Sequence, residues 1–157
     1  MAGTERGVVR KSRAALTAIL LGGMTAATID IGAACLISGH SVERILQTIA
    51  GGVLARRAFS GGLPTALLGL FLQELMGALI AGVYVAAVGV LPLLRRRWIV
   101  SGLLYGVLIF FVMNYVVVPL SAWKHWPTFS SGKFLANMAA MLLFGLIVAF
   151  FARRSAH

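Results

Sequence analysis

Four long apolar runs limit what this chain can fold into. They cover about residues 14–38, 63–94, 99–120 and 134–152, and each is close to or above the roughly 20 residues that a helix needs to cross a bilayer. Hydrophobic residues make up 60% of the 157 residues and charged residues only 11%, whereas soluble domains carry about 25% charge. The sequence therefore predicts a single integral membrane domain (1–157), an all-α four-helix bundle.

A short amphipathic helix is predicted after the first run, at about 41–56. In the stretch SVERILQTIAGGVLARR (41–57), apolar residues recur at helical spacing, and Ser41 can serve as the N-cap. The apolar residues are Val42, Ile45, Leu46, Ile49 and Val53, and polar residues such as Gln47 fall between them. We expect the helix to lie in the membrane interface, although a helix docked on the bundle as a lid fits the same pattern.

Basic residues give the chain a net charge of +10 and cluster where the apolar runs end. Such clusters anchor to anionic headgroups and fix the topology, so no nucleic-acid partner is expected. Nine of the 14 Lys and Arg residues fall on the side of the two termini and five on the other side. By the positive-inside rule, both termini are predicted to be cytoplasmic.

Polar residues interrupt the apolar runs at Asp30 and at the adjacent pair Gln73 and Glu74. Counted along ideal helices, both acids lie about 12–15 Å from the predicted outer ends. Asn114 and Asn137 fall in the same half of the membrane. Small residues share the helical faces of both acids, which indicates that these faces point into the bundle. We therefore predict one buried polar site that contains all five residues.

Two interpretations of this polar site remain open. In the first, a protonated acid hydrogen-bonds one of the two asparagines and holds the bundle together, so that the chain is a non-catalytic accessory or structural membrane protein. In the second, Asp30 and Glu74 repel each other at low dielectric, so that one holds a proton near neutral pH. The chain would then be a small proton-coupled transporter. Either protein could work as a homodimer or with other membrane proteins.

The remaining reactive residues do not suggest a catalytic or metal-binding set. His40 and His125 fall in different loops, and the single cysteine, Cys35, lies in an apolar run where we expect it to pack as a small residue. Hydrolytic or redox chemistry needs a nucleophile, a base or a cofactor ligand within mutual reach. We therefore expect no enzymatic activity, no cofactor and no metal.

Three stretches carry a resemblance to a known family: RILQTIAGGVLARRAFSGG (44–62), LLGLFLQ (67–73) and GLLYGVLIFFVMNYVVVPLSA (102–122). The most specific piece is MNYVVVPLSA (113–122). Together they resemble a family of small, uncharacterised bacterial inner-membrane proteins with four predicted helices, over about half of the chain. The resemblance implies a location in the bacterial inner (plasma) membrane, and it implies no activity.

Overall fold

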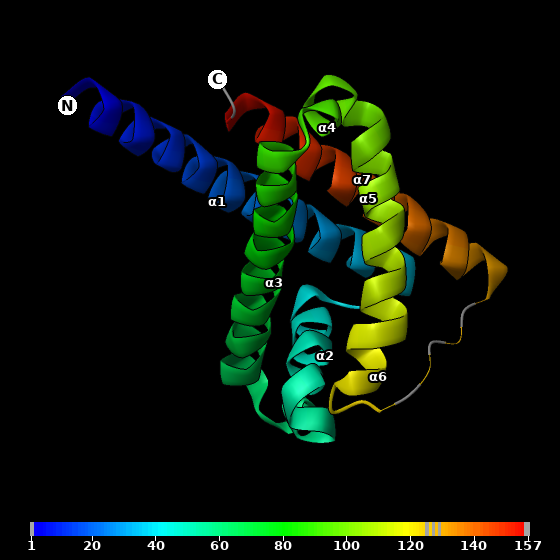
Figure 1. Ribbon diagram of the computed structural model, residues 1–157. Coiled ribbons are helices and arrows are strands. Elements are labelled where there is room, and N and C mark those ends of the chain that lie inside the picture. The colour runs from blue at the N-terminus through cyan, green and yellow to red at the C-terminus, as the bar shows by residue number, and fades with distance from the viewer. Residues whose placement is uncertain (1, 125, 127, 129, 156–157) are drawn as a thin grey trace.

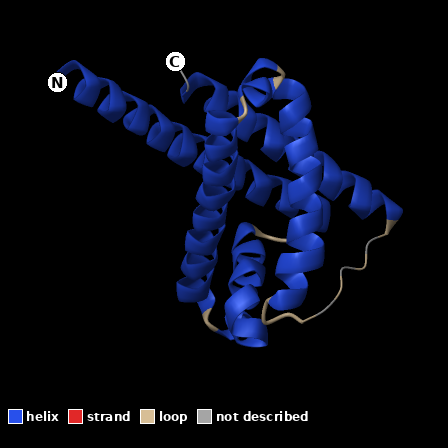
Figure 2. Ribbon diagram, in the orientation of Figure 1, coloured by secondary structure: helices blue, strands red, loops and turns tan. Residues whose placement is uncertain are grey.

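The computed structural model describes residues 2–124, 126, 128 and 130–155 (Figure 1). Side chains are described from Ser12 to Arg154 within these ranges. Helices and loops account for the whole described chain, which contains no strand (Figure 2). This confirms the predicted all-α class.

The described residues include four helical segments that are long and apolar enough to cross a membrane: Ser12–Ser38, Gly62–Val90, Trp98–Leu120 and Ser131–Arg154. They confirm the four predicted spans and the membrane-protein class. The helices are α1 (Ala2–Ser38), α2 (Val42–Leu54), η1 (Ala55–Ser60), α3 (Gly62–Val90), α4 (Pro92–Arg96), α5 (Trp98–Val112), η2 (Met113–Val117), α6 (Val118–Leu120) and α7 (Ser131–Ser155).

The second span ends at Val90, four residues before the predicted position 94. Pro92 explains the difference, because the residue before a proline is disfavoured in the helical conformation. Leu91 accordingly leaves the helix, with φ −117° and ψ 88°, and Pro92 begins the short helix α4 at a position where its missing N–H costs nothing.

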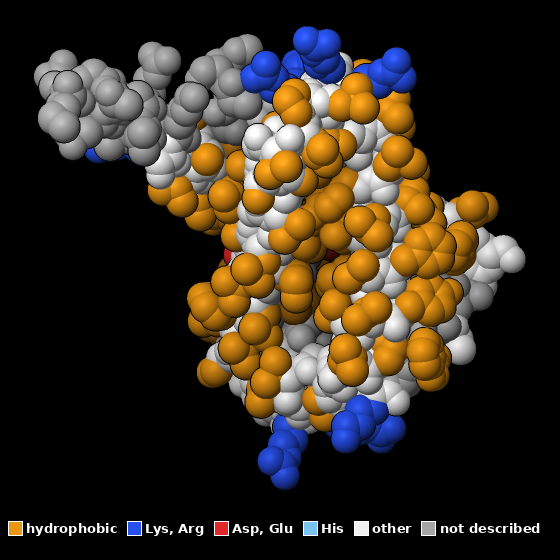
Figure 3. Space-filling view, viewed as in Figure 1, with side chains coloured by type: hydrophobic (Ala, Val, Ile, Leu, Met, Phe, Trp, Pro, Cys, Tyr) orange, Lys and Arg blue, Asp and Glu red, His pale blue; other side chains and the backbone are white. Residues whose placement is uncertain are grey.

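The spans are arranged as two crossing pairs. Figure 1 shows α1 and α7 side by side behind α3 and α5, and α7 packs along both α1 and α5. In Figure 3, hydrophobic side chains cover the middle of the molecule, and Lys and Arg gather at its two ends. One end carries α4 and the C-terminus and is called the termini end; the other carries α2 and η1 and is called the α2 end.

Hydroxyl groups tie α3 to α5 near the termini end. The hydroxyl oxygens of Tyr84 and Ser101 lie 2.7 Å apart, and Tyr105 donates to the carbonyl oxygen of Ile80 at 2.7 Å. The two tyrosine rings also pack at 4.9 Å between centroids. These contacts join α3 and α5 at the termini end, where the chain also turns through α4.

The predicted amphipathic helix is α2, and its N-cap is Ser41, whose hydroxyl accepts the Arg44 N–H at 3.3 Å. It packs along α3, where Gly69 contacts the backbone of Leu46. Of its predicted apolar residues, Val42 and Val53 are exposed. The structure thus shows α2 docked on the bundle, which is the alternative that the sequence left open.

Gln47 is buried in the docked helix, although the sequence placed it among the polar residues between the apolar positions. Only 6% of its surface is exposed. Its amide donates to the Glu43 carboxylate and to the Gly62 carbonyl, both at 3.3 Å. Burial of this amide is tolerated because hydrogen bonds replace those that it loses to water.

Candidate functional site

The candidate site lies where α1 crosses α3. The two backbones approach closely there, since a Cβ placed on Gly23 would lie 2.7 Å from the Gly77 carbonyl oxygen. Small residues allow such an approach between membrane helices. The polar residues of the two spans follow Gly23 along α1 and precede Gly77 along α3, and they form two separate pairs.

The first pair joins Asp30 to Gln73. The Gln73 amide donates to the Asp30 carboxylate (Oδ2) at 3.0 Å, and both side chains are partly buried. Asp30 follows Ala26 by one helical turn, and Ala26 belongs to the core cluster that includes Phe144 of α7. Asp30 therefore lies on the bundle side of the α1–α3 contact, as the small residues around it predicted.

The second pair joins Thr28 to Glu74. The Thr28 hydroxyl donates to one carboxylate oxygen of Glu74 (Oε1) at 3.2 Å. The other oxygen (Oε2) is buried and has no hydrogen-bond partner among the described residues. Thr28 was missed by the sequence reasoning, although it stands two residues before Asp30 in the same interrupted run. Its exposure indicates that this pair lies at the outer edge of the helix contact.

Asn114 and Asn137 are not joined to either acid. Each amide donates to the carbonyl oxygen four residues earlier in its own helix, Asn114 to Phe110 and Asn137 to Lys133, both at 2.8 Å. Side chains of this type compete for local backbone groups when no better partner is in reach. The expected hydrogen bond between an acid and an asparagine is therefore not formed. Gln73 takes the place of an asparagine at Asp30, and Thr28 does so at Glu74.

Asn114 has an unusual position, because η2 is a π-helical turn within the third span. Val118 donates its N–H to the Met113 carbonyl, five residues back. Pro119 follows directly, and a proline ring clashes with the carbonyl four residues earlier in a regular helix. The wider turn is a known way of accommodating such a break, and Asn114 lies within it.

The two pairs link α1 to α3 by side-chain hydrogen bonds, and each link contains one acid. Each acid receives one hydrogen bond from the facing helix, and no hydrogen bond joins the two acids within the described part of the chain. Figure 3 shows acidic side chains at mid-height beside α3, among hydrophobic ones. Two such links across a glycine contact fix the register of α1 on α3, because a shift would leave polar groups unpaired in an apolar medium.

Other reactive residues lie away from these two polar pairs. Cys35 is half-buried and packs against the cluster of α1, α2 and α3 that contains Ile31 and Leu46, as predicted. His40 is exposed in the turn before α2, whereas the predicted loop residue His125 lies outside the described residues. Among the side chains that the structure describes, no group of three His, Cys, Asp or Glu could hold a metal ion.

Comparison with known proteins places the chain in no family: no family model, no curated protein and no solved structure matches it.

Proposed function

We propose that this membrane protein is a non-catalytic accessory or structural component of a bacterial inner membrane, acting through helix packing with a second copy or another membrane protein. The observation that supports this function is the pairing of both intramembrane acids with polar side chains of the facing helix. Through these bonds both acids help to hold α1 on α3. The location follows from the resemblance to small bacterial inner-membrane proteins.

The lipid-facing surface supports a role in packing. Large apolar side chains are exposed along α3 and α5, among them Leu67, Leu79, Val83, Leu104 and Leu108. Such a surface is covered by lipid or by the helices of a partner. Helices in membranes associate through van der Waals packing and a few polar contacts rather than through a hydrophobic driving force.

A second candidate function, a small proton-coupled transporter, is favoured by the buried Oε2 atom of Glu74. This oxygen has no hydrogen-bond partner among the described residues, so the bond from Thr28 leaves half of the carboxylate unpaired within the spans. Ionisable groups within membrane spans are a common feature of proton relays.

Asp30→Asn and Glu74→Gln test the two functions. Both changes keep the hydrogen-bonding shape and remove titration, so we expect each variant to unfold within about 0.5 kcal/mol of the parent. In vesicles with an internal pH dye and an imposed pH gradient, we expect the parent and both variants to show the same proton movement, with or without a lipophilic cation outside.

Glu43→Gln, which removes an acid outside the four spans, is the matched control for the vesicle experiment. A cation-dependent proton movement in the parent that survives Glu43→Gln but is lost in Asp30→Asn or Glu74→Gln would favour the transporter and contradict the accessory function.

The proposed topology places both termini in the cytoplasm. Ser131 begins α7 at the opposite side of the membrane and is exposed. In a Cys35→Ala background, we expect Ser131→Cys to react with an impermeant thiol reagent added to intact cells, and Arg96→Cys in α4 to react only after permeabilisation. The reverse pattern would place the termini outside.

A further inference from the structure

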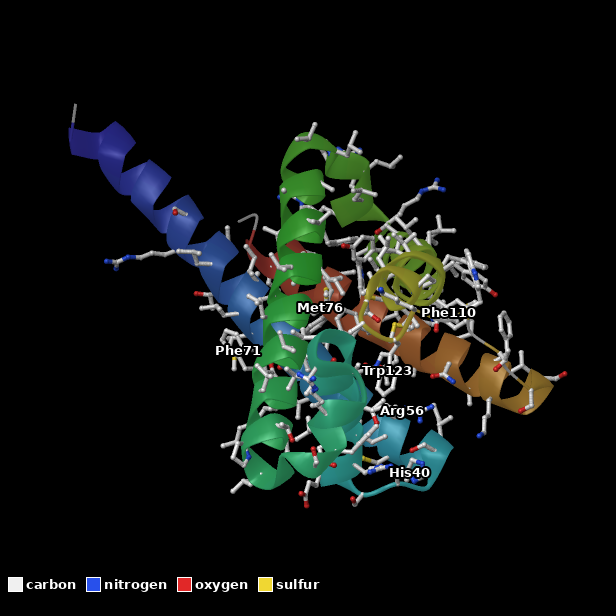
Figure 4. All side chains as sticks on the ribbon, turned by 90° about the horizontal axis from the view of Figure 1, so that it is seen from below. His40, Arg56, Phe71, Met76, Phe110 and Trp123 are labelled. Carbon is white, nitrogen blue, oxygen red and sulfur yellow. The ribbon has the colours of Figure 1, made fainter. Side chains whose placement is uncertain are left out.

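A hollow lies at the α2 end, where η1 meets the segment that follows α6. Its volume is about 630 Å³, and it is lined by Leu54, Ala55, Arg56, Arg57, Ala122 and Trp123. Figure 4 views the molecule from this end and shows Arg56 and Trp123 next to each other. The hollow therefore combines two adjacent guanidinium groups with an apolar and aromatic wall.

The two arginines have no acidic partner. Both are exposed, and neither side chain takes part in an ion pair within the described part of the chain. The nearest acid in the sequence, Glu43, instead accepts the Gln47 amide. A guanidinium group offers a fork of N–H donors that fits phosphate oxygens in pairs. Two unpaired arginines at one hollow thus favour an anionic, phosphate-bearing ligand.

The side of the hollow formed by Ala122 and Trp123 is held in place by the docking of α2. The Trp123 indole donates to the Thr48 carbonyl at 3.2 Å, and its ring contacts Gly51, where the absent side chain leaves room for it. The Ala122 N–H donates to the Gly52 carbonyl at 2.8 Å. The hollow is therefore preformed, which lowers the entropy lost when a ligand binds.

The surroundings of the hollow distinguish a lipid from a soluble phosphate. It lies at the ends of apolar spans, the level at which headgroups and tryptophan side chains meet. Val53 and Leu120, close in sequence to the lining residues, are 62% and 81% exposed. These side chains offer an apolar path for acyl chains beside a cationic site for the headgroup.

We propose that this hollow binds the phosphate of an anionic phospholipid, with Arg56 and Arg57 at the headgroup and Trp123 against the glycerol and upper acyl region. The basic residues at this end then do more than orient the chain, since they select lipids by headgroup charge. Each cation near a membrane surface strengthens the binding of anionic lipid about fivefold.

The test is a lipid titration of delipidated protein in neutral detergent, followed by native mass spectrometry. We expect a saturable one-to-one complex with phosphatidylglycerol and much weaker binding of phosphatidylcholine. Arg56→Gln with Arg57→Gln should weaken phosphatidylglycerol binding about 10- to 30-fold. Circular dichroism should confirm that the variant stays folded, because both side chains are exposed.

Arg96→Gln with Arg97→Gln is the matched control, since it removes the same charge from two adjacent, exposed arginines at the termini end. This control should leave the one-to-one complex intact. Equal weakening in both double variants, or no weakening in the first, would show charge attraction without a site and overturn the proposal. Displacement of the lipid by millimolar inorganic phosphate would assign the hollow to a soluble phosphate and overturn the lipid assignment.

Discussion

Gly145→Ala is expected to lower the free energy of unfolding by about 3 kcal/mol, although it adds one methyl group. A Cβ on Gly145 would contact the Gly102 carbonyl and lie 2.7 Å from the nitrogen of Gly106. These neighbours are backbone atoms of α5, which cannot rotate away as a side chain can. The two helices must separate instead, and they lose the close contacts that hold membrane helices together.

Gly32→Ala and Gly89→Ala are the matched controls, because a Cβ at either position would meet no atom within 4 Å. Both variants should have the same free energy of unfolding as the parent or a slightly higher one, since alanine is the better helix former. Reversible unfolding in mixed micelles of neutral detergent and dodecyl sulfate would measure all three. If Gly145→Ala is as stable as the controls, α5 and α7 do not approach through their glycines.

The four spans could be predicted because the bilayer imposes a length and a composition on any helix that crosses it. Pro92 shows where this signal ends. The apolar residues continue past Val90, so hydropathy extends the second span to position 94, whereas the backbone of Leu91 leaves the helix before the proline. Composition reports the solvent around a segment, and local stereochemistry decides where the helix stops.

The placement of α2 could not be predicted from its sequence. An apolar helix face is satisfied equally by lipid and by protein, so its periodicity does not say which of the two covers it. The amide of Gln47 shows the difference, because its burial depends on the carbonyl of Gly62, at the start of the next helix. Only the tertiary contact makes that position acceptable for a polar residue.

The grouping of the candidate site residues could be predicted only in part. Counting residues places Asp30, Glu74 and the two asparagines at similar levels, and this count carries no information about the rotation of each helix. A soluble helix reveals its inner face by a hydrophobic stripe, but a membrane helix is apolar all round. Small residues identified the contact between α1 and α3 correctly, whereas nothing in the sequence showed that Asn137 would bond to its own helix.

Thr28 illustrates the same limit. A hydroxyl within a membrane helix usually bonds to its own backbone, so it signals no site by itself. It becomes the partner of Glu74 because the glycine contact brings α3 within reach of that turn of α1. The two polar pairs are therefore a consequence of the close backbone approach, and their strength depends on it.

Asp30 and Gln73 are expected to show strong energetic coupling in a double-mutant cycle. Gln73→Leu leaves the Asp30 carboxylate without its hydrogen bond in an apolar medium, and Asp30→Leu does the same to the Gln73 amide. Each single change should lower the free energy of unfolding by about 1–3 kcal/mol. The double variant leaves neither group unpaired and loses only the net bond, which is worth about 0.6 kcal/mol in membranes.

The double variant should therefore be more stable than either single variant, an order that simple loss of packing does not produce. Asn137→Leu is the control, because among the described residues its amide bonds only to the Lys133 carbonyl within α7, and its removal leaves no described side chain unpaired. The same unfolding assay in mixed micelles measures the whole cycle. Additive losses in the double variant would mean that the two side chains do not meet, and α1 would then be held on α3 by its glycines and alanines alone.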